Sequence, residues 1–254
     1  MSLENLSKEC LYNWLGYGKI NSPIWFIGTE EGGAEIWRKK TKTLEESLRI
    51  RQSFNLSMDF VEVWEKKYNI KLSSFKGANV WRYIAAFILS INNQDITKEN
   101  IYNFINVEKK LGRSDSDHFL CELLPLPKER KNSISPYEDW SSLKKYHDEV
   151  MPKRFELIKK SIEKNSKIKL IISYEKELAK IIEENLSTKK VKDWKANEGK
   201  ENYTLYEVSL SDERKLFLLS TPFFGNGRIS YRGINESVKN LKKLNIVNSN
   251  GIKL

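Results

Sequence analysis

The sequence predicts an α/β fold: a three-layer α/β/α sandwich with a short, mostly parallel central sheet. Residues 24–27, 118–123 and 168–173 are short apolar runs, a pattern typical of strands buried on both faces of a parallel sheet. Stretches with helical spacing of apolar residues separate these runs. Because strands that alternate with helices are joined by right-handed crossovers, we expect helices on both faces of the sheet.

The other elements follow from apolar spacing along the chain. Residues 3–15 place Leu6, Leu11 and Leu15 on one helical face, and Pro23 lies beyond the end of that helix. Residues 34 to about 105 have mostly helical spacing and form an insertion between the first two strands. The remaining predicted elements are helices at 139–164, 174–186 and 235–244, strands at 204–208 and 216–220, and a polar connection at 187–202.

The composition is that of a single domain over residues 1–254, because 39% of the residues are hydrophobic and the length is ordinary for an α/β domain. The 44 Lys and Arg residues outnumber the 34 Asp and Glu residues and give a net charge of +10. This excess favours an acidic partner such as DNA, and the alternative is a solvated basic surface.

The cysteines and histidines are few. Cys10 and Cys121 make no disulfide framework and lack metal-ligand spacing, which favours a reducing compartment, and His118 and His147 are the only histidines. No apolar stretch reaches the ~18 residues of a membrane-spanning helix. We therefore expect a cytoplasmic protein with no metal, no cofactor and no membrane contact, and we take it to be a monomer.

Polar residues follow the ends of the predicted strands. Glu30 and Glu31 come after the first strand, Glu122 ends the second, Tyr174 follows the third and residues 221–228 follow the last. In parallel sheets ligands bind beyond the carboxyl ends of the strands. These segments are therefore expected to converge on one edge of the sheet.

The segment TEEGG, residues 29–33, combines carboxylates with glycines. The glycines allow a tight turn and close approach of the backbone to a ligand, while a carboxylate at a strand end can orient a water molecule. The alternative is that Glu30 or Glu31 caps the next helix, where the helix dipole favours an acid.

The segment LLSTPFFGNGRISYRG, residues 218–233, combines adjacent aromatic residues with a Gly-Asn-Gly turn and two arginines. Phe223 and Phe224 could stack on bases, and arginines can hold phosphates. The alternative is a packed turn with surface arginines. In the middle strand Glu122 stands among apolar neighbours, so it requires a partner: a base edge, a metal, a lysine or backbone amides.

These three segments, in this order, resemble the uracil-DNA glycosylase superfamily. Residues 28–32, Gly-Thr-Glu-Glu-Gly, are similar to its first motif, residues 119–130 to its middle strand and exit, and residues 220–228 to its late loop. The resemblance implies a short parallel sheet between helices, DNA as partner, and a hydrolase that cleaves the N-glycosidic bond of a flipped base in DNA repair.

The resemblance also implies roles for individual residues. Glu30 falls where the family positions the hydrolytic water, Glu122 falls at the base-reading residue, and Thr221 or Ser220 stands in place of the family histidine. The implied base pocket contains Gly28, Thr29, Glu31, Gly32 and Glu122, and the implied DNA contacts are Pro222, Phe223, Phe224, Asn226, Arg228 and Arg232.

The sequence departs from the family pattern at three points. Glu31 replaces the motif proline, Glu122 replaces an amide, and no histidine follows His147. Three hypotheses remain. The first is a DNA base glycosylase, the second a protein of similar fold that binds nucleic acid or a nucleobase without cleavage, and the third a metal-dependent phosphodiesterase using Glu30, Glu31 and Glu122.

Overall fold

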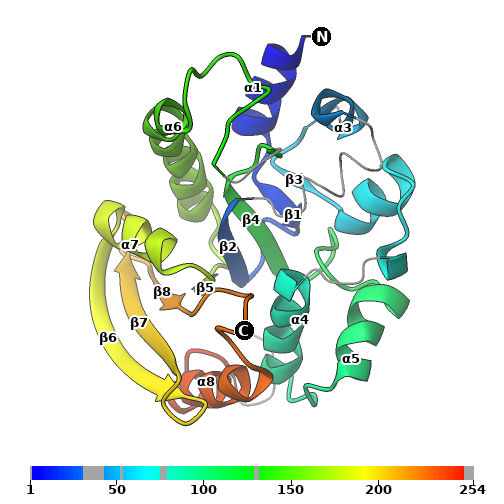
Figure 1. The fold of residues 1–254 in the computed structure, drawn as a ribbon. Coiled ribbons are helices and arrows are strands. Elements are labelled where there is room, and N and C mark those ends of the chain that lie inside the picture. Colours follow the sequence, from blue (N-terminus) through cyan, green and yellow to red (C-terminus); the bar gives the residue numbers. More distant parts are fainter. Residues whose placement is uncertain (1, 31–42, 52–53, 75–78, 129–131, 249–254) are drawn as a thin grey trace.

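The computed structural model describes residues 2–30, 43–51, 54–74, 79–128 and 132–248. One eight-stranded mixed sheet, in the order β3-β1-β4-β2-β5-β8-β7-β6, runs through it (Figure 1). The strands are β1 (Gly16–Gly18), β2 (Ile24–Glu30), β3 (Ser57–Met58), β4 (His118–Leu124), β5 (Leu170–Ser173), β6 (Ser187–Ala196), β7 (Glu201–Ser209) and β8 (Lys215–Ser220).

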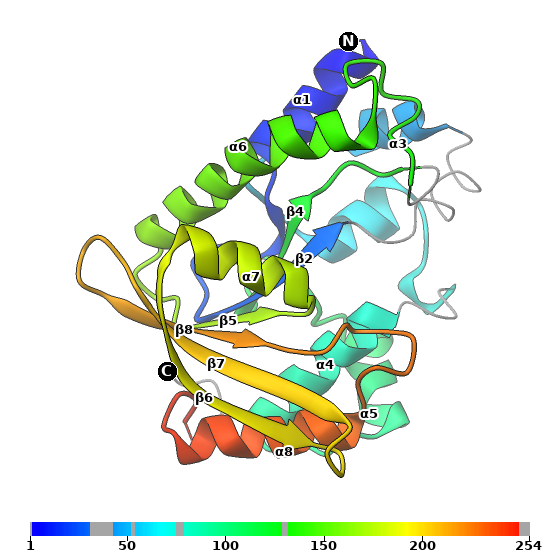
Figure 2. The same ribbon diagram turned by 60° about the vertical axis from the view of Figure 1, so that its left-hand side comes forward.

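Helices surround this sheet on both faces. The α-helices are α1 (Leu3–Asn13), α3 (Leu44–Arg51), α4 (Asn79–Ile91), α5 (Lys98–Tyr102), α6 (Leu143–Lys164), α7 (Lys176–Asn185) and α8 (Tyr231–Lys243), and the short helical turns are η1 (Glu62–Lys67), η2 (Leu72–Ser74) and η3 (Asn103–Val107). Helices α6 and α7 lie over one face, and α4 and α8 lie over the other (Figure 2). The predicted three-layer α/β arrangement is therefore present.

The prediction of a short, mostly parallel sheet is wrong. Strands β4, β2, β5 and β8 do run parallel to one another at the centre. However, β1 pairs antiparallel with β4, and β7 and β6 add two antiparallel strands beside β8. Only the central strands carry the continuous apolar runs that indicate burial on both faces. The sequence pattern therefore predicted the parallel strands at the centre of the sheet and did not predict the antiparallel strands at its edges.

The predicted polar connection at 187–202 is also wrong. Residues 187–196 form β6, which pairs along its whole length with β7 and carries a register shift between Lys190 and Lys192. Most side chains of β6 are exposed, so no apolar alternation marks the strand. Lysines on an edge strand discourage pairing with another chain, which explains why this strand looks like a solvated loop in the sequence.

The predicted helical insertion, residues 34 to about 105, falls between β2 and β4. Helices α3, α4 and α5 lie within it, but residues 62–67 form a π-helical turn and residues 57–58 form the short strand β3. The start of the insertion, at 34–42, lies outside the described residues.

One buried arginine fastens α6 to the sheet. Arg154 has no exposed surface, and its guanidinium donates to the carbonyls of Glu122 (2.7 Å) and Leu123 (3.0 Å) at the end of β4. It also donates to the carbonyls of Leu11 and Trp14 at the end of α1. Four carbonyl groups from two elements are thus satisfied by one planar group with five N–H donors.

Replacing this guanidinium is expected to destabilise the fold strongly. Arg154→Met leaves four buried carbonyls without a donor, so the free energy of unfolding should fall by at least about 3 kcal/mol. Arg154→Lys should recover little of this loss, because an ammonium lacks the planar fork. Urea denaturation measures both, with the exposed Lys160→Met on the same helix as a near-neutral control.

A buried histidine also predicts how stability depends on pH. Nε2 of His118 accepts a hydrogen bond from the Gly112 N–H (2.9 Å), and burial lowers the pKa of this imidazole to about 3. In the unfolded chain the same side chain titrates near 6.5. The unfolded state therefore takes up a proton first as pH falls.

We expect the free energy of unfolding to decrease by about 2 kcal/mol between pH 7 and pH 5 through His118 alone. In His118→Gln, which keeps an acceptor for Gly112, this part of the pH dependence should disappear. Denaturant titrations of both proteins at the two pH values give the difference. Equal pH dependence in the two proteins would show that His118 stays accessible to protons.

Candidate active site at the carboxyl edge of the sheet

The four parallel strands create a switch point between β2 and β5. In sequence these strands come first (β2), second (β4), third (β5) and fourth (β8), and in space they lie in the order second, first, third, fourth. The connection from β2 leads to one side and the later strands add on the other side, so a crevice is expected outside the carboxyl ends of β2 and β5. Gly28 pairs with Glu122, and Ser173 pairs with both Ile27 and Ser220. The expected convergence of these strand ends is therefore confirmed.

Glu30, the last residue of β2, has a lysine and a histidine beside it. Nζ of Lys128 lies 2.7 Å from Oε1 of Glu30, and Nε2 of His147 lies 3.8 Å from the same oxygen. The Lys128 side chain is only 6% exposed and that of Glu30 is 27% exposed. A carboxylate, an ammonium and an imidazole thus meet at the end of the central strand, and the carboxylate keeps contact with solvent.

The imidazole of His147 is held in its neutral form. Burial lowers its pKa, and the positive charge of Lys128 lowers it further, while the carboxylates of Glu30 and Asp148 act in the opposite direction. Nε2 of His147 is buried and has no hydrogen-bond partner among the described residues. A neutral imidazole in this place can accept or donate a proton.

Glu122 has the partner that its apolar surroundings required. The hydroxyl of Tyr174 donates to Oε1 of Glu122 over 2.9 Å. Burial is the main cause that raises the pKa of Tyr174 well above its ordinary value, and the adjacent carboxylate raises it further. Tyr174 also covers Gly28, where an added Cβ would lie 2.0 Å from the tyrosine oxygen, so only glycine fits at this position.

A third carboxylate lies on the other side of β2. Glu175 follows β5, and burial raises its pKa; the hydroxyl and backbone of Thr29 act against this effect, and the charge of Glu30 adds to it. The edge therefore carries Glu30, Glu122 and Glu175, and the ammonium of Lys128 is paired with Glu30. A carboxyl group whose pKa is raised by burial, as at Glu175, is typical of sites that handle protons.

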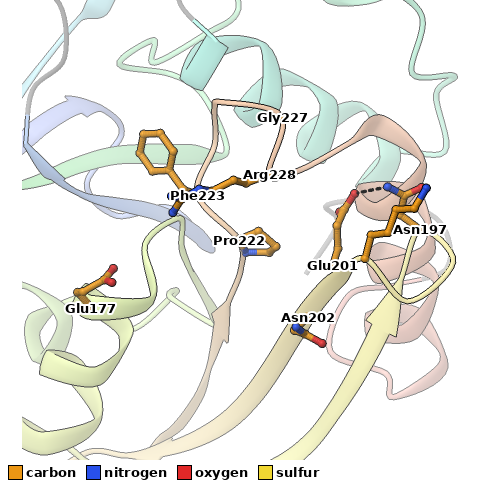
Figure 3. Close-up of a pocket in the computed structure, with 9 residues that line it drawn as sticks. Glu177, Asn197, Glu201, Asn202, Pro222, Phe223, Gly227 and Arg228 are labelled. Carbon is orange, nitrogen blue, oxygen red and sulfur yellow. Dashed lines mark hydrogen bonds between the residues drawn. The ribbon is translucent and has the colours of Figure 1, made fainter.

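The loop after β8 borders a separate pocket of about 330 Å³ between α7 and the β6–β7 hairpin (Figure 3). Its described lining consists of Glu177, Asn197, Lys200, Glu201, Asn202, Pro222, Phe223, Gly227 and Arg228. Neither Glu30 nor Glu122 is among these lining residues. Figure 3 shows the Glu201 carboxylate turned toward Asn197. Glu201 also accepts from the hydroxyls of Tyr203 and Ser230, so its charge is already satisfied.

Two residues of this loop are placed against expectation. Phe224 has no exposed surface; its ring stacks on Tyr174 (5.0 Å between centroids) and on Phe87 (5.5 Å). Thr221 is also fully buried, and its hydroxyl donates to the Ser173 and Pro222 carbonyls. In this structure Phe224 cannot stack on a base and Thr221 cannot reach a leaving group, because the chain turns back into the core directly after β8.

The other predicted residues differ in accessibility. Asn226 and Arg228 are exposed in the turn, and Asn226 has a positive φ of 53°. Ser220 and Phe223 are half-buried, and Pro222 is buried beside the pocket. Arg232 is exposed on α8 and ion-paired with Glu198 and Glu236. Glu31 and Gly32 lie outside the described residues. Contact of any of these residues with DNA stays a prediction.

Sequence reasoning missed Lys128, His147 and Glu175. Lys128 follows the Pro-Leu-Pro exit of β4, which a bond from the Tyr137 hydroxyl to the Pro127 carbonyl (2.7 Å) holds in place. The two prolines directly after β4 were the feature of the sequence that could have indicated Lys128. His147 gave none, because it lies within α6 and reaches Glu30 only through the packing of that helix.

Comparison with known proteins gives no family. No family model matches the chain, and no curated protein matches it. Among the described residues no group of three or more His, Cys, Asp or Glu side chains could hold a metal ion, although Glu31 is not among them. No helix in the described part of the chain is long and apolar enough to cross a membrane.

The electrostatics of this edge predict how His147 titrates. The chain has two histidines, and His118 stays neutral to low pH, so an NMR titration of imidazole resonances isolates His147. In Lys128→Gln the pKa of His147 should rise, because a nearby positive charge is lost. In Glu30→Gln it should fall, because a nearby negative charge is lost. If the pKa of His147 is the same in both variants, the charges of Glu30 and Lys128 do not act on this imidazole.

Proposed function

We propose that the protein is a nucleic-acid base glycosylase whose reacting centre is the carboxyl edge of β2. The observation that carries this proposal is the carboxylate of Glu30 beside the ammonium of Lys128 and the neutral imidazole of His147 at the switch point of the sheet. Hydrolysis of an N-glycosidic bond needs an oriented water and stabilisation of a cationic sugar and an anionic leaving base. Glu30 and Lys128 supply the two kinds of charge, and the neutral imidazole of His147 can transfer a proton.

In this proposal Glu30 orients the attacking water and stabilises the developing oxocarbenium ion. Lys128 holds the carboxylate by an ion pair in which the ammonium is almost fully buried. The same positive charge offsets the negative charge of a departing base, the task that the family resemblance assigns to a histidine after the last strand. Neutral His147 can accept the proton of the water or pass one to the base.

The base would be read by Glu122, whose position is stiffened by aromatic packing behind it. The Glu122 carboxylate only accepts hydrogen bonds, and one of its oxygens already accepts from Tyr174. A carboxylate at this position favours a base edge rich in N–H donors over uracil. Tyr174 and Phe224 stack on each other beneath this position and stiffen it.

DNA as the partner is supported by the net charge of +10 and by the resemblance of residues 28–32, 119–130 and 220–228 to the uracil-DNA glycosylase superfamily. An enzyme of this kind extrudes its target base from the helix and acts on it in a pocket. The alternative is a protein that binds a nucleobase or nucleic acid without cleavage. One observation favours this alternative: Lys128 already occupies one oxygen of Glu30 by its hydrogen bond.

The experiment compares Glu30→Gln with the wild type. Both are incubated in excess over oligonucleotides carrying a panel of modified bases, and abasic sites are detected by alkaline cleavage. We expect Glu30→Gln to slow single-turnover base release by about 10²-fold or more while binding hardly changes, because the amide keeps the shape and loses the charge.

The matched control is Glu65→Gln, which removes another partly buried carboxylate that is ion-paired with a lysine, Lys109. It should release the base at the wild-type rate. Full activity of Glu30→Gln would remove Glu30 from the mechanism. Tight binding of oligonucleotides by the wild type with no base released from any of them would favour the non-cleaving alternative.

A further inference from the structure

The edge strand β6 and the helix α8 carry an excess of positive charge that the proposed reacting centre does not use. Together these two elements contain eight Lys and Arg residues and two acids, Asp193 and Glu236. Helix α8 packs against β6 (Figure 2), and Glu236 accepts a hydrogen bond from the Asn197 N–H at the tip of the β6–β7 hairpin over 2.8 Å. The excess charge is therefore concentrated on one side of the molecule.

The acids next to the lysines of β6 are already engaged. Asp193 is the only acid of β6, and it is ion-paired with Lys190 over 2.5 Å. Glu207 on β7 lies opposite Lys189 in the register of the hairpin and is ion-paired with Lys215 over 2.9 Å. These carboxylates therefore do not balance the other lysines of the strand.

Three lysines of β6 form an exposed row. Lys189, Lys192 and Lys195 are exposed, and none of them makes an ion pair within the part of the chain that the structure describes. In the register of the hairpin, Lys192 and Lys195 lie opposite the uncharged Leu205 and Asn202. Because β6 is the last strand of the sheet, its outer edge pairs with no described strand. We call these three residues the lysine row.

Helix α8 adds to the charge of the lysine row. Lys239 follows Glu236 by three residues, so it lies on the side of the helix that faces the hairpin. The Asn197 N–H and Arg232 lower the pKa of Glu236, and the charge of Lys239 has a smaller effect in the same direction. Lysines on an edge strand discourage pairing with another chain. That explanation does not extend to Lys239, because a helix has no open strand edge.

The surface around the lysine row is poor in exposed apolar side chains. In β6, Val191 is the only large hydrophobic residue that is exposed, and the ring of Trp194 lies flat on Tyr203 with 6.0 Å between centroids. The apolar side of α8, with Ile234 and Val238, is buried. Protein interfaces are depleted in lysine, and membrane-binding helices need an exposed apolar face. Nucleic-acid interfaces are polar and strongly positive, so nucleic acid fits this surface best.

The lysine row leads to the carboxyl edge of the sheet. Strand β6 runs parallel to the central strands, because it pairs antiparallel with β7 and β7 pairs antiparallel with β8. Lys195 therefore lies at the edge on which Glu30 is found. The row spans five residues of β7, which is about 17 Å at ~3.4 Å per residue. One strand of duplex DNA presents a phosphate about every 3.4 Å of its axis, so about five phosphates fit alongside.

We propose that the lysine row and Lys239 hold the phosphate backbone of a nucleic-acid duplex. The backbone runs along β6 toward the carboxyl edge, where the target base leaves the helix. The surface has no exposed aromatic ring on which unpaired bases could stack, which favours a duplex over a single strand. Lysines contact phosphates as point charges, so binding is independent of sequence. The inference rests on the nucleic-acid partner of the proposed function and not on cleavage.

The test measures the affinity of the full chain for a short fluorescein-labelled, unmodified DNA duplex at salt concentrations between about 50 and 200 mM. The triple variant Lys189→Gln/Lys192→Gln/Lys195→Gln should reduce the magnitude of the slope of log K against log salt by about 2.7, or about 0.9 for each phosphate contact. Replacing the same three lysines by Arg keeps the charge and should keep the slope. If the triple Gln variant does not fold, Lys192→Gln alone should reduce the magnitude of the slope by about 0.9.

The matched control is Lys66→Gln/Lys71→Gln/Lys110→Gln. It removes the same charge from exposed lysines in the segment that follows β3, the strand at the opposite end of the sheet from β6. Its slope should equal that of the wild type. An equal reduction in both triple variants would overturn the inference, because net charge alone would then act. No duplex binding by the wild type would also overturn it.

Two further readouts separate this surface from other accounts. If the β6 triple variant loses binding to phosphatidylserine vesicles while its duplex slope is unchanged, the surface binds a membrane and the inference is wrong. Base release tests the proposed function separately. A reduced slope in the β6 variant with no base released from any duplex supports the surface and refutes the glycosylase. Base release with an unchanged slope refutes the surface and supports the glycosylase.

Discussion

The site depends on the buried guanidinium of Arg154. A charged group without exposed surface is costly unless every donor is used, and here the donors bind the carbonyls at the ends of β4 and α1. Burial lowers the pKa of Arg154, as expected for a cation removed from water. Because α6 is fixed at this point, His147 lies beside Glu30; it stands two turns earlier on the same helix. Lys128, which follows the end of β4, contacts the same carboxylate.

The chemistry of the edge follows from crowding carboxylates where water is scarce. Burial raises the pKa of Glu175, while Glu122 is held by the hydroxyl of Tyr174. Lys128 is the ammonium found among these groups and is paired with Glu30. Glu30, which is partly exposed and has a cation beside it, is thus the carboxylate suited to meet a water molecule. Glu122 and Glu175 are suited to accept hydrogen bonds from a ligand.

The sequence predicted those elements whose side chains are all buried in the same apolar surroundings. The central strands are apolar on both faces, and Glu30 and Glu122 could be placed at their carboxyl ends by a general rule of parallel sheets. Strand β6 was missed because pairing with β7, and not burial, makes it a strand. His147 was missed because only the tertiary packing of α6 brings it to Glu30, and Phe224 was misplaced because no local pattern shows that the chain turns inward after β8.

The most direct test of a functional edge uses the two histidines as reporters. NMR spectra of the imidazole resonances are recorded while the protein is saturated with an oligonucleotide that it binds. If nucleic acid occupies the edge, the His147 resonances shift and those of His118, fully buried at the start of β4, stay in place. Saturation of binding with both sets of resonances unmoved would contradict the claim that Glu30, Lys128 and His147 form the site.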